Sequence, residues 1–367
     1  MHNGAVFVIV IVSALAFDFT NGFHDTANVV ATSVSTRAMS PRLAVTFAAL
    51  LNFAGAFISL KVAATVGQGI VSASAITPTI LFAGLIGAIF WNLITWYFGL
   101  PSSSSHALIG GLVGAVIAGK GADEVIASGL VGKVVVPALV APTLTFVTAA
   151  LGILVIYRIV GALRPGPVGG GFKLGQIVSG GLLALAHGTN DAQKTMGVIT
   201  LALIAHGDIP ASNFHVPEWV VISAASAIAL GTYSGGWRII RTMGSRIIKM
   251  DSAQGFAAQS AGAAVILAAS HYGYPLSTTH VISGGVMGAG AAKRVSAVRW
   301  GVAGNIAVAW ALTIPAAGAI GGAVYGVTRV FGSGAAGPLV VSAALLVVTA
   351  LALVRRIQQG SPITAEA

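Results

Sequence analysis

The 367-residue chain contains no cysteine, and only 8% of its residues are charged. The first absence excludes disulfides and thiolate metal sites, and the second is far from the roughly 25% of charged residues in a soluble domain. The sequence also lacks a Walker-type phosphate loop, a nucleophile–base pair and any metal-ligand motif. We therefore expect neither an ATP-driven pump nor an enzyme, and no cofactor.

Apolar residues dominate instead. They make up 56% of the chain, and the mean hydropathy is +0.91. A membrane-spanning helix needs about 20 mostly apolar residues, and the 48 glycines favour close helix packing in lipid. The sequence therefore predicts an all-α polytopic membrane protein. The predicted crossings are residues 5–35, 43–66, 78–98, 101–119 and 126–157, then 175–205, 217–237, 252–272, 275–292, 301–327 and 336–354.

The formal net charge of +10 is distributed unevenly along these crossings. With the N-terminus outside, 14 of the 19 Lys and Arg residues fall in cytoplasmic segments, while Asp123, Glu124, Asp208 and Glu218 fall outside. This is the positive-inside asymmetry of membrane proteins. It predicts a cell-membrane protein with an external N-terminus and a cytoplasmic central linker and C-terminus. The basic excess requires no nucleic acid partner.

Two blocks of sequence occur twice. Gly-Phe-His-Asp-Thr-Ala-Asn (22–28) recurs as Gly-Thr-Asn-Asp-Ala-Gln-Lys (188–194), and Gly-Leu-Pro-Ser-Ser-Ser-Ser-His (99–106) recurs as Gly-Tyr-Pro-Leu-Ser-Thr-Thr-His (273–280). Five crossings precede the linker, so the second copy would be inverted, as in many secondary transporters. A duplication kept for packing alone would explain the glycines but not the paired polar clusters.

The predicted organisation follows from this repeat. Two inverted repeats of about five membrane segments each would bring broken or re-entrant helices together at a central site. The expected parts are an N-terminal repeat (1–162), a short cytoplasmic linker (163–174), an inverted C-terminal repeat (175–330), and an additional transmembrane helix with a tail (331–367).

Aspartates lie inside the predicted crossings. A charge at the bilayer centre costs about 3 kcal/mol or more, so such residues pair, line a water-filled cavity or bind a cation. Asp25 and Asp191 are equivalent in the repeat, and we expect them to form a cation site. The alternative is a helix cap or an ion pair, for example between Asp191 and Lys194. Asp18 would share a helix face with Asp25, and its functional and structural interpretations carry equal weight.

Amides and a histidine accompany the two aspartates. Hard cations prefer oxygen ligands, and Asn28, Asn190 and Gln193 would add amide oxygens to the coupling-ion site. His24 stands where the second half has Asn190. It could relay protons near neutral pH, or it could simply orient Asp25.

The serine and threonine blocks favour an anion. Each follows a Gly-x-Pro break, so its hydroxyls stand at the start of a new helix, where free N–H groups and the helix dipole attract phosphate-like anions. Ordinary N-capping explains one hydroxyl per block, but not three in a row, twice. We expect His106 and His280, which end the blocks, to have a structural role. The predicted anion-binding residues are Ser103, Ser104, Ser105, Ser277, Thr278 and Thr279.

Together these motifs resemble the signatures of the inorganic phosphate transporter (PiT) family, in the same order and over nearly the whole chain. The resemblance implies phosphate symport by alternating access, with Asp25, Asn28, Asn190 and Asp191 and both hydroxyl blocks around a central phosphate and cation site. His24, where many members have asparagine, is similar to the bacterial low-affinity Pit-type permeases, which are associated with proton-coupled uptake of metal-phosphate complexes. The long hydrophilic loop that many members carry between the halves is missing here.

The leading hypothesis is a proton-coupled phosphate symporter, with co-transported H⁺ or Na⁺ and a divalent metal that accompanies phosphate. The open alternatives are sodium coupling, a sulfate permease of the same fold and, less favoured, an anion channel. Sulfate carries no proton near neutral pH, so the two aspartates favour phosphate. The sequence also leaves open whether the chain forms a homodimer.

Overall fold

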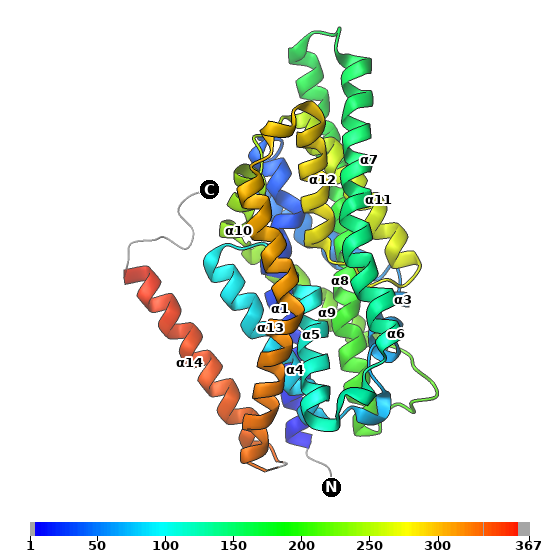
Figure 1. Cartoon of the computed structure of the whole chain (residues 1–367), viewed down its shortest axis with the longest axis vertical. Coiled ribbons are helices and arrows are strands. Elements are labelled where there is room, and N and C mark those ends of the chain that lie inside the picture. Colours follow the sequence, from blue (N-terminus) through cyan, green and yellow to red (C-terminus); the bar gives the residue numbers. More distant parts are fainter. Residues whose placement is uncertain (1–3, 333, 359–367) are drawn as a thin grey trace.

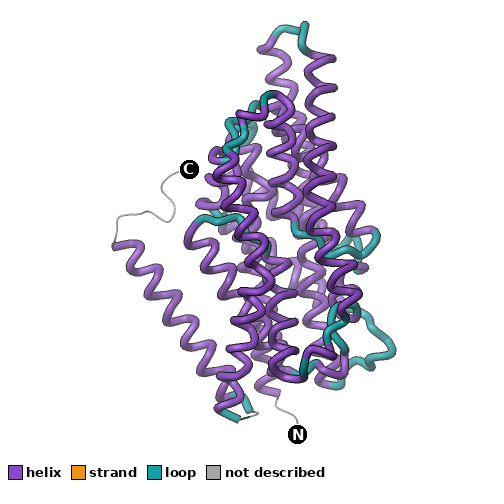
Figure 2. Tube along the Cα trace, viewed as in Figure 1, coloured by secondary structure: helices purple, strands orange, loops and turns teal. Residues whose placement is uncertain are grey.

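The computed structural model describes residues 4–332 and 334–358, and this part of the chain is helical except for connecting loops (Figure 2). Its only β-type pairing is an isolated antiparallel bridge between Val71 and Val125. The all-α prediction is therefore confirmed. The α-helices are α1 (Gly4–Ser35), α2 (Pro41–Gly55), α3 (Lys61–Gln68), α4 (Pro78–Phe98), α5 (Ser104–Lys120), α6 (Ala127–Leu130), α7 (Val136–Val160), α8 (Pro165–His206), α9 (Glu218–Ser234), α10 (Trp237–Arg241), α11 (Ser252–His271), α12 (Thr278–Lys293), α13 (Trp300–Val330) and α14 (Ala336–Gln358).

The described residues contain fewer full crossings than the eleven predicted. Six helical segments are long and apolar enough to cross a membrane, or seven when the pair of α9 with Trp237–Arg246, bent by 62°, counts as one. The segments that fail are α2 with α3, α5, α11 and α12. An apolar run in the sequence does not show whether its helix stops halfway across the membrane. The sequence therefore predicted too many crossings.

Two helical hairpins account for part of this difference. The α4–α5 hairpin fills the lower half of the molecule in Figure 1 and the α11–α12 hairpin the upper half, and their turns meet near mid-height. The turns are in direct contact, since the Ser105 hydroxyl donates to the Leu276 carbonyl at 3.1 Å. α5 has 17 residues and α12 has 16, so neither reaches the length of a typical crossing. A hairpin returns the chain to the side it came from, as two crossings would.

The predicted crossing 43–66 is also broken, into α2 and α3. Side chains of α8 satisfy the backbone groups that the break exposes: Gln193 Oε1 accepts from Val62 N at 2.8 Å and Ala63 N at 3.2 Å, and Thr189 donates to Gly55 O at 2.8 Å. Membrane helices can end at mid-depth only where such partners exist.

The two longest helices with repeated motifs, α1 and α8, cross the centre of the molecule. Glycine lets each approach a neighbour closely. A Cβ on Gly22 of α1 would lie 2.4 Å from Ile228 O of α9, and a Cβ on Gly188 of α8 would lie 2.1 Å from Asn52 O of α2. Both glycines belong to the repeated motif, so the motif fixes packing as well as polar chemistry.

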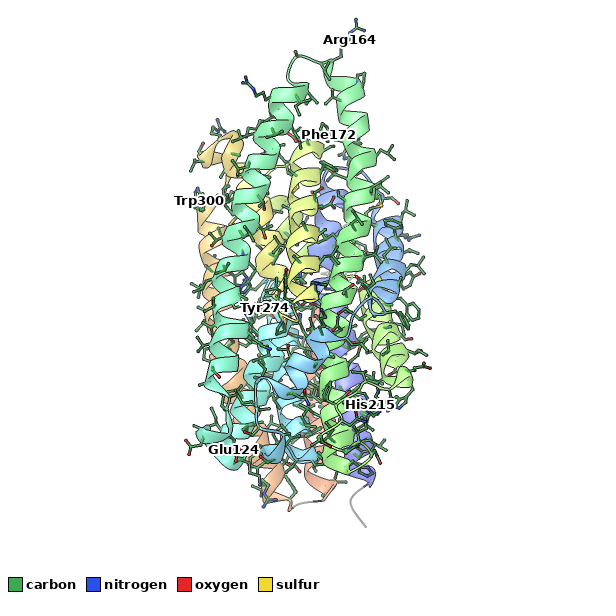
Figure 3. All side chains as sticks on the ribbon, turned by 90° about the vertical axis from the view of Figure 1, so that its right-hand side faces the viewer. Glu124, Arg164, Phe172, His215, Tyr274 and Trp300 are labelled. Carbon is green, nitrogen blue, oxygen red and sulfur yellow. The ribbon has the colours of Figure 1, made fainter. Side chains whose placement is uncertain are left out.

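The connection between the halves differs from the prediction. α8 begins at Pro165, ten residues before the predicted start at 175, because proline suits the first turn of a helix. Arg164 marks one tip of the molecule, whereas Glu124 and His215 lie toward the opposite end (Figure 3). α14 starts at that opposite end and leans away from the body (Figure 1). Residues 359–367 of the predicted tail lie outside the described residues.

Candidate functional site

A polar stripe runs along α1 and consists of Asp18, Asn21, Asp25 and Asn28. The spacing of three, four and three residues places these side chains on one face of the helix. Each side chain is at most 2% exposed. The helix therefore carries two carboxylates through an apolar protein interior.

A second stripe lies on α8 and consists of His187, Asn190, Asp191 and Lys194, which are also buried. The two stripes meet at the hairpin turns, where α5 and α12 begin. The structure thus brings together both repeated Asp motifs and both hydroxyl blocks, which are separated by up to 253 residues in contacts such as that between Asp25 and Thr278.

Asp25 is held by groups from two other helices, α5 and α12, and by its neighbour His24 on α1. Ser104 donates to its Oδ2 at 2.7 Å and Thr278 at 3.4 Å. His24 Nδ1 lies 2.7 Å from its Oδ1. Hydroxyls from both hairpins therefore reach one carboxylate.

Asp191 is neutralised by a lysine. Lys194 Nζ lies 2.5 Å from Asp191 Oδ1, and it also donates to Ser105 Oγ at 2.5 Å and to Leu276 O at 2.8 Å. The ion pair considered from sequence is present, and it joins the α8 motif to both hairpin turns. A buried, hydrogen-bonded ion pair of this kind is expensive to break.

Among the predicted anion-binding hydroxyls, one in each block is an N-cap. Ser103 Oγ accepts from His106 N at 3.1 Å, and Ser277 Oγ accepts from His280 N at 3.3 Å. The other hydroxyls contact the polar centre. Thr279 Oγ1, for example, accepts from Asn28 Nδ2 at 2.9 Å. The first backbone N–H groups of α5 and α12 have no intrahelical partner, so both helix starts retain donors at the centre.

The amides divide into two groups. Asn28 and Asn190 use their Nδ2 atoms for hydrogen bonds to hydroxyls, and their buried Oδ1 atoms have no partner within the described chain. Amide oxygens are among the ligands that hard cations accept. Gln193 differs, because its oxygen is bound to the start of α3. Its oxygen is thus already engaged, whereas those of Asn28 and Asn190 are not.

His24 and its repeat counterpart Asn190 make matching contacts. His24 Nε2 lies 3.0 Å from Thr95 Oγ1, near the end of α4, and Asn190 Nδ2 donates to Ser270 Oγ at 2.8 Å, near the end of α11. Both ring nitrogens of His24 are therefore engaged. This geometry is that of a group that orients Asp25 and ties α1 to the hairpin.

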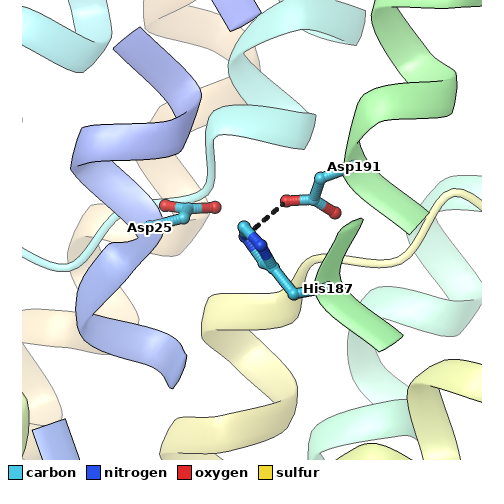
Figure 4. A group of neighbouring side chains, drawn as sticks. All are labelled: Asp25, His187 and Asp191. Atoms are coloured by element: carbon cyan, nitrogen blue, oxygen red, sulfur yellow. Dashed lines mark ion pairs between the residues drawn. The ribbon is translucent and has the colours of Figure 1, made fainter. Parts of the chain in front are cut away.

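His187 was not predicted as a site residue. Its Nε2 lies 3.2 Å from Asp191 Oδ2, and its Nδ1 lies 3.1 Å from Asn52 Oδ1. In Figure 4 the ring stands between Asp191 and Asp25. One ligand atom from each of Asp25, His187 and Asp191 lies within 4.8 Å of the others, a spacing that fits one divalent ion with N and O ligands. Its position one helical turn before Asp191 was the signal in the sequence.

His106 and His280 pack together where α5 and α12 start. Their rings meet edge to face with centroids 4.7 Å apart, and His280 stacks on Trp310 at 4.0 Å. Both stand beside the polar centre and contact neither carboxylate, which fits the structural role predicted for them.

The polar centre is closed in this conformation. A cavity of ≈ 520 Å³ lies elsewhere, between α14 and the body, and residues such as Phe19, Leu93 and Trp96 line it. Two carboxylates, a lysine, two imidazoles and hydroxyls from two hairpins are thus enclosed in a bundle of apolar helices. This combination defines a multi-pass membrane transporter with a central polar site.

The comparisons with known proteins agree. The model of the "Phosphate transporter family" matches residues 21–321, and the chain belongs to this family of transporters, not enzymes. The chain is 53% identical over 325 residues to a "Probable low-affinity inorganic phosphate transporter" of Mycobacterium bovis, covering 89% of this chain and 78% of that protein. It is 42% identical over 320 residues to a Bacillus subtilis protein of the same description, covering 87% and 96%. The resemblance inferred from the motifs is confirmed.

A solved structure has the same fold. "The sodium-dependent phosphate transporter" superposes with a TM-score of 0.81 over 89% of this chain and 99% of its own, at 24% identity.

Proposed function

We propose that the chain is a secondary active symporter that takes up inorganic phosphate by alternating access, driven by protons. The observation that carries this proposal is the meeting of Asp25 with hydroxyls from both hairpins, Ser104 at 2.7 Å and Thr278 at 3.4 Å. Membership of the phosphate transporter family supports phosphate as the substrate.

Phosphate would bind where the two hairpin turns meet. Ser104, Ser105, Thr278 and Thr279, with the first N–H groups of α5 and α12, would donate to its oxygens. Ser103 and Ser277 would hold the helix starts in place as N-caps. Phosphate near neutral pH carries protons, which it can donate to Asp25 or Asp191. Hydroxyls that contact these carboxylates in the closed centre would turn to the anion when it enters.

The coupling cation would bind beside the anion. Asp25 and Asp191 supply charge, and the free Oδ1 atoms of Asn28 and Asn190 supply neutral oxygens. His24 would position Asp25. A divalent metal that accompanies phosphate would add His187 as a nitrogen ligand, because its ring already stands between the two carboxylates.

Alternating access would come from two inverted repeats, 1–162 and 175–330, joined by the segment 163–174 and followed by 331–367. Two sets of contacts support this arrangement. Motif glycines Gly22 and Gly188 pack against α9 and α2 respectively, so each repeat's first helix contacts the second helix of the other. The hairpin helices α5 and α12 likewise contact α13 and α7, at Ile314 and Pro142. Such an exchange is expected of intertwined repeats.

The orientation follows from charge. Arg164 and its basic neighbours occupy one end, and Glu124 lies toward the other (Figure 3). By the positive-inside rule, the Arg164 end faces the cytoplasm of a cell membrane and the N-terminus faces outward.

Sodium coupling is the second candidate, because the structural neighbour carries that description. A sulfate permease of the same fold is the third. It would have no use for two carboxylates able to accept a substrate proton, and Asp25 and Asp191 are both present in the buried centre. An anion channel would need a continuous pore, whereas the centre is enclosed.

Radiolabelled phosphate uptake into proteoliposomes tests the proposal. An imposed pH gradient without sodium should drive accumulation, and a protonophore should abolish it. Unlabelled sulfate should not compete. Accumulation that requires sodium would replace proton coupling by sodium coupling. Sulfate uptake without phosphate uptake would overturn the substrate, and passive equilibration alone would indicate a channel.

A further inference from the structure

Asp18 is the buried carboxylate of the α1 polar stripe that takes part in none of the contacts described above. It stands seven residues before Asp25 on α1, which is about 10 Å along the helix axis toward the N-terminal end. Its exposed fraction is 0%. Neither carboxylate oxygen has a hydrogen-bond partner among the described residues.

The groups that face Asp18 are polar and interact with the carboxyl, but they lie outside ordinary hydrogen-bond geometry. Asn21 from α1 and Thr195 from α8 present their side chains to the carboxyl. Both amide atoms of Asn21 and the hydroxyl of Thr195 are buried without a hydrogen bond in the described structure. Five unsatisfied polar atoms therefore gather in one place, where buried polar atoms are normally paired.

No positively charged side chain of the described residues forms an ion pair with Asp18. The charged groups that face it are Asp191 and Lys194, both on α8. Lys194 is already bound to Asp191, Ser105 and Leu276 O. An unpaired carboxylate within a membrane protein costs several kcal/mol, so Asp18 requires a proton or a bound cation.

The ligand atoms around Asp18 indicate which kind of cation the site would bind. It offers one carboxylate and neutral oxygens, with no imidazole. Divalent ions usually take more carboxylate or imidazole ligands than this. One negative charge among neutral oxygens suits a small monovalent cation.

Asp18 also breaks the internal repeat. The offset of 166 that relates Asp25 to Asp191 relates Asp18 to Ala184. A carboxylate present in one half only is not part of the scaffold that both halves share. It gives the central site a cation-binding extension on one side, toward the end where α1 begins.

We propose that Asp18, Asn21 and Thr195 form a second cation site, which takes up the coupling cation as a proton on Asp18 or as Na⁺ among the oxygens. This inference rests on the proposed symport function. It adds, at Asp18, a cation site that is separate from the central site at the hairpin turns.

The test compares Asp18→Asn with wild type in proteoliposomes. Asparagine mimics the neutralised carboxylate, so exchange of internal for external radiolabelled phosphate should continue. Accumulation driven by a pH or sodium gradient should fall by about tenfold or more, because the variant has lost the coupling between cation binding and phosphate binding at this site. Asp208→Asn, at an exposed carboxylate, is the matched control and should accumulate phosphate normally.

Thr195→Val distinguishes the two cations. Loss of a hydroxyl ligand should raise the sodium concentration needed for uptake if Na⁺ occupies the site, and should leave pH-driven accumulation in place if a proton does. Gradient-driven accumulation by Asp18→Asn at the wild-type level would overturn the site. Loss of exchange together with accumulation would also overturn it, because Asp18 would then serve phosphate binding or folding.

A measurement that does not involve phosphate tests the site even if the proposed function is wrong. The melting temperature of the detergent-solubilised protein is followed in NaCl against choline chloride, and across pH. Wild type should respond to one of these cations more strongly than Asp18→Asn, which keeps only the central cation site. An identical response of both proteins would exclude the site, whatever the substrate is.

Discussion

The hydroxyl of Ser104 donates to Asp25 Oδ2 at 2.7 Å and joins the start of α5 to the middle of α1. Thr278, at the start of α12, reaches Asp25 and Asp191 at 3.4 Å each. The two hairpin turns are therefore connected to both long central helices through carboxylates. Together the two aspartates connect α1, α5, α8 and α12.

Asp25→Asn and Asp191→Asn should each abolish concentrative phosphate uptake while the protein remains folded and inserted. Each removes the charge that balances the coupling cation, and Asp191→Asn also leaves Lys194 unpaired. The measurement is gradient-driven uptake in proteoliposomes, with size-exclusion profiles as the check on folding. Asp123→Asn, at an exposed position, is the control. Near-normal uptake by either variant would remove that aspartate from the central site.

His24→Asn should reduce uptake only modestly, by about threefold to tenfold, because asparagine can keep the contact with Thr95 that Asn190 makes with Ser270 in the other half; one hydrogen bond is worth about 1 kcal/mol. His24→Leu cannot keep it and should reduce uptake further. Initial rates at several external pH values provide the test. A His24→Asn protein that takes up phosphate only with sodium would show instead that the imidazole relays the proton.

Much of the site was predictable because polar residues are rare in this sequence. Asp25, Asp191 and the two hydroxyl blocks stood out against apolar neighbours, and their repetition indicated that they meet. The contact of the Gln193 amide with the start of α3 could not be predicted, because it depends on the break between α2 and α3. That break is a tertiary feature: the chain can stop a helix there only because α8 supplies partners.

The same reason explains the overcounted crossings. Residues 101–119 and 275–292 have the composition of short spans, but α5 and α12 start at mid-height, where their first residues contact the opposite hairpin and the motif helix α1. His187 escaped notice because a lone histidine has no ligand spacing in sequence, and its neighbours Asn52 and Asp25 come from distant segments.

His187→Gln should lower metal-stimulated phosphate uptake more than metal-free uptake. Glutamine is similar in size but lacks the imidazole nitrogen that stands between Asp25 and Asp191 (Figure 4), and loss of one ligand typically costs about tenfold or more in metal affinity. Uptake is measured with Mn²⁺ and with the metal removed by chelation. The exposed His215→Gln serves as the control. Equal loss with and without metal would assign His187 to positioning Asp191 alone.

The absence of native cysteine makes orientation directly measurable. Arg164→Cys, at the tip between the halves, should react with a membrane-impermeant maleimide only after the cells are permeabilised. Glu124→Cys should react in intact cells, because charge places that end outside. The reverse pattern would invert the proposed topology, and labelling of both positions in intact cells would mean a mixed orientation.

Gly22→Ala should destabilise the protein by about 1–3 kcal/mol, the usual cost of overpacking a tight contact. The added Cβ would lie 2.4 Å from Ile228 O, a backbone atom that cannot turn aside as a side chain would. Thermal unfolding in detergent measures the effect as a lower melting temperature. Gly152→Ala in α7 is the matched control, because a Cβ there meets nothing within 4 Å. If Gly22→Ala has the same melting temperature as Gly152→Ala, the close approach of α1 to α9 is not the reason for glycine in the motif. The motif would then need glycine at this position because α1 moves during transport. In that case Gly22→Ala would lower phosphate uptake without changing stability.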